Sequence, residues 1–71
     1  MSFSISRNGK QVESHATYGQ AWRAFWILTA QALKYGLPGD YHFDPVEAVR
    51  EDIPWAALPD WAVEVLRDEG F

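Results

Sequence analysis

Residues 17–36 read TYGQAWRAFWILTAQALKYG, and this stretch decides the fold because it holds both ends of one long helix. Thr17 and Gln20 form a Thr-x-x-Gln capping box, which satisfies backbone donors of the first helical turn. Gly36 stands where helices commonly end on a left-handed residue. The sequence therefore predicts an α-helix over about residues 18–35.

Apolar side chains cover most of this predicted helix. They recur at spacings of three and four, the period of a helix face that packs on a core. They include Ala21, Trp22, Phe25, Trp26, Leu28, Ala32 and Leu33, with Ile27 and Ala30 extending the face. We expect the helix to be covered on more than one flank, and we interpret its aromatic residues as core rather than as a ligand pocket.

A β-hairpin is predicted ahead of the helix, over about residues 2–15. Phe3, Ile5 and Val12 alternate with polar residues, as in strands with one buried face. Asn8-Gly9 favours a type I′ turn, because Asn and Gly adopt positive φ at little cost. Two strands alone are marginally stable in water, so we expect the hairpin to pack on the helix.

Two short helices are predicted after the long one, over about residues 45–52 and 59–68. Asp44-Pro45 combines an N-cap with a proline at the first helical position, and Pro59-Asp60 opens the last helix. Residues 41–43 are an extended piece, and the sequence leaves open whether they join the hairpin as a third strand. These elements predict one α+β domain over residues 1–71.

Composition restricts how so small a chain is stabilised. The 71 residues include no cysteine and only two histidines, so disulfides and metal sites are not expected to support the fold. Self-association or dense apolar packing is then required, and four tryptophans supply the packing. We predict a core of Phe3, Ile5, Val12, Trp22, Phe25, Trp26, Leu33, Val49, Trp61, Val65 and Leu66.

No catalytic, cofactor or metal motif stands out. His42 lies between Asp40 and Asp44, but no cysteine or nearby second histidine completes a ligand set. The most apolar stretch, residues 24–33, is about half the length that a bilayer requires, and the amino terminus lacks the pattern of a signal peptide. We expect a cytoplasmic protein that is not an enzyme and binds no cofactor, metal or membrane.

Charge is divided unevenly along the chain, whose net charge is −4. Residues 1–39 carry four basic residues and one acidic residue, whereas residues 40–71 carry nine acidic residues and two basic ones. Contact with phosphates requires a positive surface, so direct binding of nucleic acid by the acidic half is disfavoured. A partner protein with a basic surface is favoured instead.

Carboxylates in the acidic half recur at helical spacing. Asp60, Glu64 and Asp68 stand at i, i+4 and i+8, and Glu47 and Glu51 repeat this spacing in the preceding predicted helix. Like charges so spaced disfavour a helix by about 0.2–0.5 kcal/mol per pair. Such a row can imitate a phosphate backbone and occupy a groove built for DNA or RNA. The alternative is an ordinary solvated face of an acidic protein.

Aromatic residues outside the long helix are further candidates for partner contact. Trp55 follows Pro54 between the two predicted short helices, so it is either a lid on the core or an exposed anchor. Tyr41, Phe43 and Phe71 share this ambiguity.

In size, acidity, lack of cysteine and order of elements, the chain resembles the small phage-encoded inhibitors of bacterial defence, the anti-CRISPR proteins in particular. This resemblance implies stoichiometric binding to a CRISPR effector complex in the host cytoplasm, commonly at a positively charged DNA-binding surface. It implies that Asp60, Glu64, Asp68, Glu47 and Glu51 are candidate contacts.

These observations lead to one hypothesis of function and one alternative. The first is a small acidic binding protein that inhibits or regulates a larger, positively charged, nucleic-acid-binding complex. The alternative is a small housekeeping or toxin–antitoxin-type module that acts by homodimerisation or through an aromatic patch.

Overall fold

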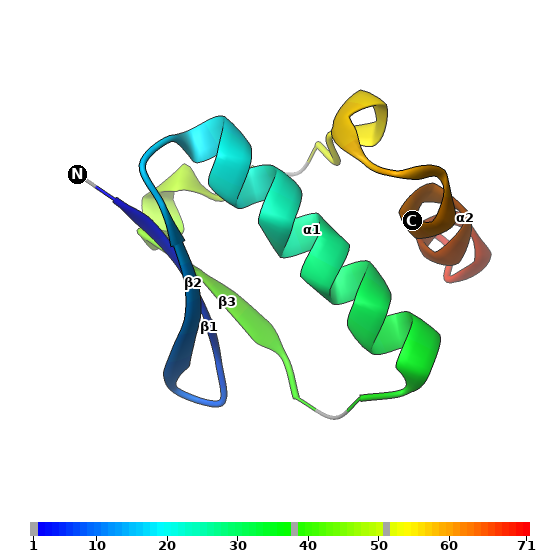
Figure 1. The fold of residues 1–71 in the computed structure, drawn as a ribbon, viewed down its shortest axis with the longest axis horizontal. Coiled ribbons are helices and arrows are strands. Elements are labelled where there is room, and N and C mark those ends of the chain that lie inside the picture. The colour runs from blue at the N-terminus through cyan, green and yellow to red at the C-terminus, as the bar shows by residue number, and fades with distance from the viewer. Residues whose placement is uncertain (1, 38, 51) are drawn as a thin grey trace.

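The structure is a computed structural model, and it describes residues 2–37, 39–50 and 52–71. Its longer elements are the strands β1 (Phe3–Arg7), β2 (Lys10–His15) and β3 (Tyr41–Asp44) and the helices α1 (Tyr18–Tyr35) and α2 (Asp60–Asp68). Two short 3-10 helices, η1 (Val46–Ala48) and η2 (Trp55–Ala57), lie between β3 and α2. The fold is α+β, and α1 lies between the sheet and α2 (Figure 1).

The predicted hairpin is confirmed. Asn8 and Gly9 connect β1 to β2 with φ of 52° and 81°, the positive values that a type I′ turn requires. β1 and β2 pair antiparallel, and the register shifts between the Ile5–Glu13 pair and the Ser6–Gln11 pair. Val12 therefore has no partner in β1, as expected of the extra residue in a β-bulge.

A third strand joins the hairpin. β3 pairs antiparallel with β1, so the strand order is β2-β1-β3 and β1 is central. Phe43 lies opposite Ile5, and both side chains are buried against α1. His42 lies opposite Ser6 and is exposed, because successive strand residues point to opposite faces of the sheet.

Both predicted ends of α1 are confirmed. The Thr17 hydroxyl oxygen accepts a hydrogen bond from the Gln20 backbone N–H at 3.4 Å. Gly36 adopts the left-handed conformation, and its N–H donates to the carbonyl of Ala32. The Leu37 N–H also donates to the Ala32 carbonyl, at 2.9 Å. Both termini of α1 are thus specified by residues adjacent to them in sequence.

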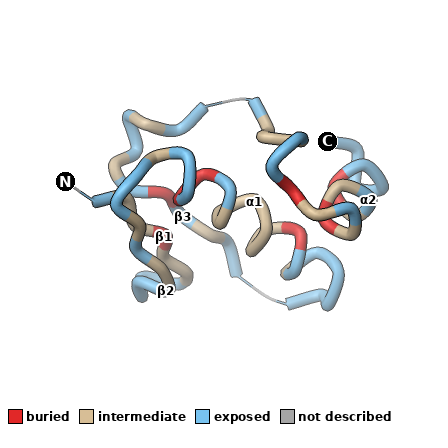
Figure 2. Tube along the Cα trace, turned by 45° about the horizontal axis from the view of Figure 1, so that its top comes forward, coloured by how far each residue is buried: buried red, intermediate tan, exposed pale blue. Residues whose placement is uncertain are grey.

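α1 contributes to two groups of buried residues, one toward the sheet and one toward α2. Figure 2 marks buried residues in red along the chain. The first group, here the sheet cluster, consists of Ile5, Ala21, Trp22 and Phe43. The second, here the α2 cluster, consists of Ala30, Leu58, Ala62 and Leu66. Trp26 packs against both. The predicted coverage of α1 on more than one flank is therefore confirmed.

The predicted helix over residues 45–52 is wrong. Only Val46–Ala48 form a 3-10 helix, and Val49 is already extended, with ψ of 132°. Tertiary contacts explain the difference, because the Asp52 carbonyl accepts from Trp22 Nε1 at 2.9 Å and the Arg50 guanidinium lies over the Tyr18 ring. These contacts hold the segment along α1 and override its local helix signals.

Three residues of the predicted core are exposed: Val12, Leu33 and Val49. Val12 is displaced from the β1–β2 register by the bulge. Leu33 lies in the last turn of α1, and Val49 lies where the predicted helix does not form. The other eight predicted residues are buried or half-buried, and Ile5 and Leu66 are fully enclosed.

Candidate functional site

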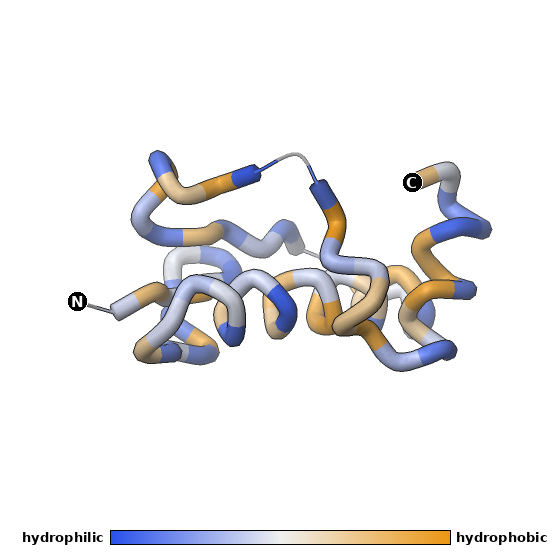
Figure 3. Tube along the Cα trace, turned by 90° about the horizontal axis from the view of Figure 1, so that it is seen from above, coloured by the Kyte–Doolittle hydropathy of each residue, from blue (hydrophilic) through white to orange (hydrophobic). Residues whose placement is uncertain are grey.

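Helix α2 has one buried face and one charged face. Ala62 and Leu66 are buried against Ala30 of α1, and Trp61 and Val65 pack beside them. Hydrophobic and hydrophilic residues alternate along this helix, near the end of the chain marked C in Figure 3. Because the apolar residues recur at helical spacing, they orient the helix and turn its carboxylates away from α1.

The predicted row of carboxylates is present on α2. Asp60, Glu64 and Asp68 are all helical and exposed. With a rise of 1.5 Å per residue, steps of four separate them by about 6 Å along one face. The only ion pair within residues 2–37, 39–50 and 52–71 joins Glu13 and His15, so no described cation forms an ion pair with this row.

Arg67 is close to the row in sequence but makes a different contact. Its guanidinium lies over the Trp55 ring, 5.3 Å from the centroid. Trp55 is half-buried and packs against the α2 cluster. Of the two alternatives, a cover on the core or an exposed anchor, Trp55 is therefore the cover on the core. The Arg67 guanidinium contacts its ring although the carboxylates of the row are close in sequence.

The second predicted row is not a helical row. Glu47 is exposed on η1, three residues long, and the chain leaves helical geometry at Val49. Glu51 lies outside the described residues. The i, i+4 geometry expected for these two carboxylates depended on a helix over residues 45–52, which does not form. The remaining candidate, Tyr41, is half-buried at the start of β3, with the Arg7 guanidinium 6.0 Å from its ring centroid.

A polar groove between β2 and α1 was not predicted. His15 Nε2 lies 2.9 Å from a carboxylate oxygen of Glu13, and both side chains line the groove with Gln20 and Arg23. Strand alternation was the signal that would have found this pair, since residues i and i+2 share a face. A carboxylate can orient a histidine for proton transfer, but no hydroxyl or thiol lines the groove, so a nucleophile is missing among its described residues.

Tyr18 is the first residue of α1, and its ring is covered by the guanidinium of Arg50. Its ring stacks on Trp22 with centroids 5.7 Å apart, and the Arg50 guanidinium lies 4.7 Å from its centroid. The hydroxyl oxygen is buried without a hydrogen-bond partner among the described residues. Burial raises the pKa of Tyr18, Arg50 lowers this pKa in part, and Asp52 raises it.

Replacing Tyr18 with phenylalanine is expected to reduce the loss of stability at alkaline pH. The pKa of Tyr18 is raised in the folded protein, so its neutral hydroxyl contributes to the stability of the fold. This contribution to stability is complete below the unfolded-state pKa of about 10 and is lost as pH rises through the pKa of the folded protein. Urea unfolding at pH 7 and at about pH 11 measures this. Near-equal stability at pH 7 and a smaller alkaline loss in Tyr18→Phe are expected; an equal loss in both proteins would contradict the assignment.

None of the helices described combines the length and the apolar character needed to cross a membrane. Within residues 2–37, 39–50 and 52–71, no three His, Asp or Glu side chains converge as a metal site would require. The sequence matches no model of a protein family, and comparison with curated proteins and with solved structures gives no match.

Proposed function

We propose that this chain is a small acidic binding protein that docks the carboxylates of α2 on the basic surface of a larger, nucleic-acid-binding partner. The observation that carries the proposal is the row formed by Asp60, Glu64 and Asp68, which is exposed and has no ion pair with a described cation. A partner with lysine or arginine side chains at matching spacing would provide the missing counter-charges.

Repulsion between the carboxylates of the row costs helix stability, which favours a role beyond folding, although Asp60 itself lies in the first turn, where the helix dipole favours a carboxylate. Each like-charged i, i+4 pair disfavours the helix by about 0.2–0.5 kcal/mol. Asp68 is also the last residue of α2, where the partial negative charge of the helix terminus opposes a carboxylate. Docking on a cationic surface would relieve both repulsions and would accelerate association at low salt.

Inhibition is the form of this activity that we favour. A row of carboxylates on a helix presents acceptor oxygens as a nucleic-acid backbone does, so it can compete for the same basic groove. The resemblance to anti-CRISPR proteins points to a CRISPR effector complex as that partner. Under this proposal the chain acts by occupancy and catalyses no reaction.

Charge reversal of the row is expected to abolish most of the binding. Tagged native chain and the Asp60→Lys, Glu64→Lys, Asp68→Lys variant are used for capture from the source cells at low and high salt. Exposed ion pairs contribute roughly 0.2–1 kcal/mol each, so loss of three should weaken binding by about threefold to 150-fold, and repulsion by the three new lysines should weaken it further. Capture by the native chain should fall steeply as salt increases.

A second triple variant distinguishes the effect of the carboxylate row from the effect of the net charge of the chain. Asp44→Lys, Glu47→Lys and Asp52→Lys change the charge equally at exposed sites outside α2. Glu47 belongs to no helical row in the structure, so the proposal gives it no part in binding. This control is expected to keep near-native capture. If both variants lost capture of the partner equally, the effect would be one of overall charge. If the α2 variant captured the partner as the native chain does, the row would be excluded as the contact surface.

Protection of a phage tests the inhibitory form directly. In bacteria whose CRISPR system targets a phage, expression of the native chain is expected to restore plaques, whereas the α2 variant is expected not to. If neither protein restores plaques against any effector class tried, the CRISPR version is excluded.

Self-association is a second candidate, favoured by one observation. Leu33, Leu37 and Phe71 are exposed and line a common hollow. Burying this surface against a second copy would remove apolar area from water. Light scattering at increasing concentration should then show a dimer that Phe71→Ala disrupts, and a monomer at high concentration would exclude this candidate.

A further inference from the structure

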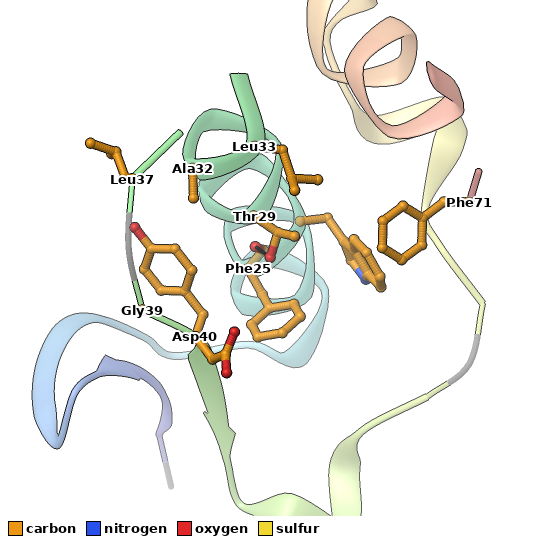
Figure 4. A pocket seen from close by; sticks show the side chains of 10 residues that line it. Phe25, Thr29, Ala32, Leu33, Leu37, Gly39, Asp40 and Phe71 are labelled. Carbon is orange, nitrogen blue, oxygen red and sulfur yellow. Dashed lines mark hydrogen bonds between the residues drawn. The ribbon is translucent and has the colours of Figure 1, made fainter. Parts of the chain in front are cut away.

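An open hollow of about 490 Å³ lies where the middle of α1, the start of β3 and the end of the chain approach one another. Phe25, Thr29 and Leu33 of α1 form its floor, Gly39 and Asp40 border one side, and Phe71 stands on the other (Figure 4). Its volume falls in the range of roughly 300–1,000 Å³ typical of ligand sites.

Several aromatic rings and the carboxylate of Asp40 line the hollow. Trp26 packs edge-on against Phe71, with centroids 5.6 Å apart, and edge-on against Phe25 at 5.6 Å. Phe71 is 55% exposed, so this residue remains accessible from solvent. Among the described residues that line the hollow, Asp40 is the only charged one. Negative ring faces beside a carboxylate form a local environment that attracts cations.

Elsewhere the chain places its own cations over its aromatic rings. Four of its basic residues make such contacts, at 4.7 to 6.0 Å from the ring centroids: Arg50 over Tyr18, Arg67 over Trp55, Lys34 over Tyr35 and Trp61, and Arg7 over Tyr41. None of these contacts involves Phe25, Trp26 or Phe71. Three of the aromatic residues that line the hollow therefore have no described cation over their rings, whereas Tyr41 on its border has Arg7.

We propose that the hollow receives one lysine or arginine side chain of the basic partner, as the anchor of the interface. The proposal rests on the proposed function, because that function requires a partner rich in these residues. The aliphatic stem of such a side chain would pack on Phe25 and Leu33, and its charged head would lie near Asp40 and the ring of Phe71.

Arg7 sets the side on which this cation lies. Its guanidinium is over the Tyr41 ring, at the border of the hollow that also carries Asp40. A second cation would be repelled from the Tyr41 ring, so the incoming head is expected between Asp40 and Phe71.

Titration with short peptides tests the anchor without the whole partner. Acetyl-Gly-Lys-Gly-amide and its norleucine counterpart share the aliphatic stem and differ in the charge. In ¹H–¹⁵N spectra of the full chain, the lysine peptide should shift the Trp26 indole signal in a saturable way and leave that of Trp22 in place. Because a cation over an exposed ring contributes roughly 0.5–1 kcal/mol, the norleucine peptide should bind about twofold to fivefold more weakly. Equal binding of the two peptides, or no saturable shift, would overturn the proposal.

Two aspartates provide a matched pair of variants. Asp40→Asn removes the carboxylate of the hollow, whereas Asp44→Asn removes an exposed carboxylate at the other end of β3. An exposed ion pair contributes roughly 0.2–1 kcal/mol, so Asp40→Asn should weaken the lysine peptide by up to about fivefold while Asp44→Asn leaves it unchanged. Equal effects of the two substitutions would overturn the role of Asp40.

The charge-reversed α2 variant separates the two proposals. Its hollow is intact, so it should bind the lysine peptide as the native chain does even though partner capture is lost. If the lysine peptide binds but charge reversal on α2 does not change partner capture, the proposed function is contradicted and the proposal for the hollow is not. Signal broadening that grows with protein concentration, without a response to peptide, would assign the hollow to a second copy of the chain and overturn the anchor.

Discussion

Replacing Trp22 with alanine is expected to lower the free energy of unfolding by about 3–5 kcal/mol, as truncation of large buried aromatic residues generally does. Trp22 is only 4% exposed and packs with Ile5 and Phe43 at the centre of the sheet cluster. Its indole N–H also donates to the Asp52 carbonyl, at 2.9 Å. A chain of 71 residues is held by about 4–10 kcal/mol in all, so this variant should be close to unfolding at room temperature.

Urea denaturation followed by circular dichroism measures this loss. Trp22→Phe keeps part of the apolar volume and removes the hydrogen bond, so it should fall between the native chain and the alanine variant. Val46→Ala, at a residue 68% exposed, is the control and should change stability by less than about 0.5 kcal/mol. A Trp22→Ala variant as stable as Val46→Ala would show that the sheet cluster is not the principal core.

The elements predicted correctly are those whose signals are local. The Asn8-Gly9 turn and the caps of α1 at Thr17 and Gly36 each depend on backbone preferences within a few residues. Such preferences act before tertiary contacts form, so a single sequence is enough to reveal them.

The errors fall where distant contacts decide the conformation. Asp44-Pro45 carries a strong signal for a helix start, yet Arg50 and Asp52 contact Tyr18 and Trp22 of α1, and the segment follows α1 instead. The bulge at Val12 depends on the register between two strands, which alternation of apolar residues does not fix.

The candidate site divides in the same way. The row on α2 was predictable because i, i+4 spacing places side chains on one face of any helix. The hollow was not, because Phe25, Asp40 and Phe71 come from three segments far apart in sequence. Nor could the sequence show that most of its basic residues lie over aromatic rings, which depends on side-chain packing.

Replacing Leu66 with alanine is the other large effect, expected to cost about 2–5 kcal/mol. Leu66 is fully enclosed in the α2 cluster with Ala30 and Ala62. These two small residues bring α1 and α2 close together, so little neighbouring volume can collapse into the space left by the substitution. Urea denaturation measures the total loss, with Val65→Ala at a half-buried position of the same helix as the matched control.

Hydrogen exchange measures which part of the fold loses stability in Leu66→Ala. The sheet cluster contains no residue of α2, so it retains its own contacts when α2 detaches from α1. Amides of α2 should therefore lose protection first in Leu66→Ala, while those of β1 stay protected. Uniform loss across both would show instead that the two clusters unfold as one unit. In the expected case the carboxylate row is held in place by Leu66, and Leu66→Ala should weaken partner capture although this side chain lies on the opposite face of the helix.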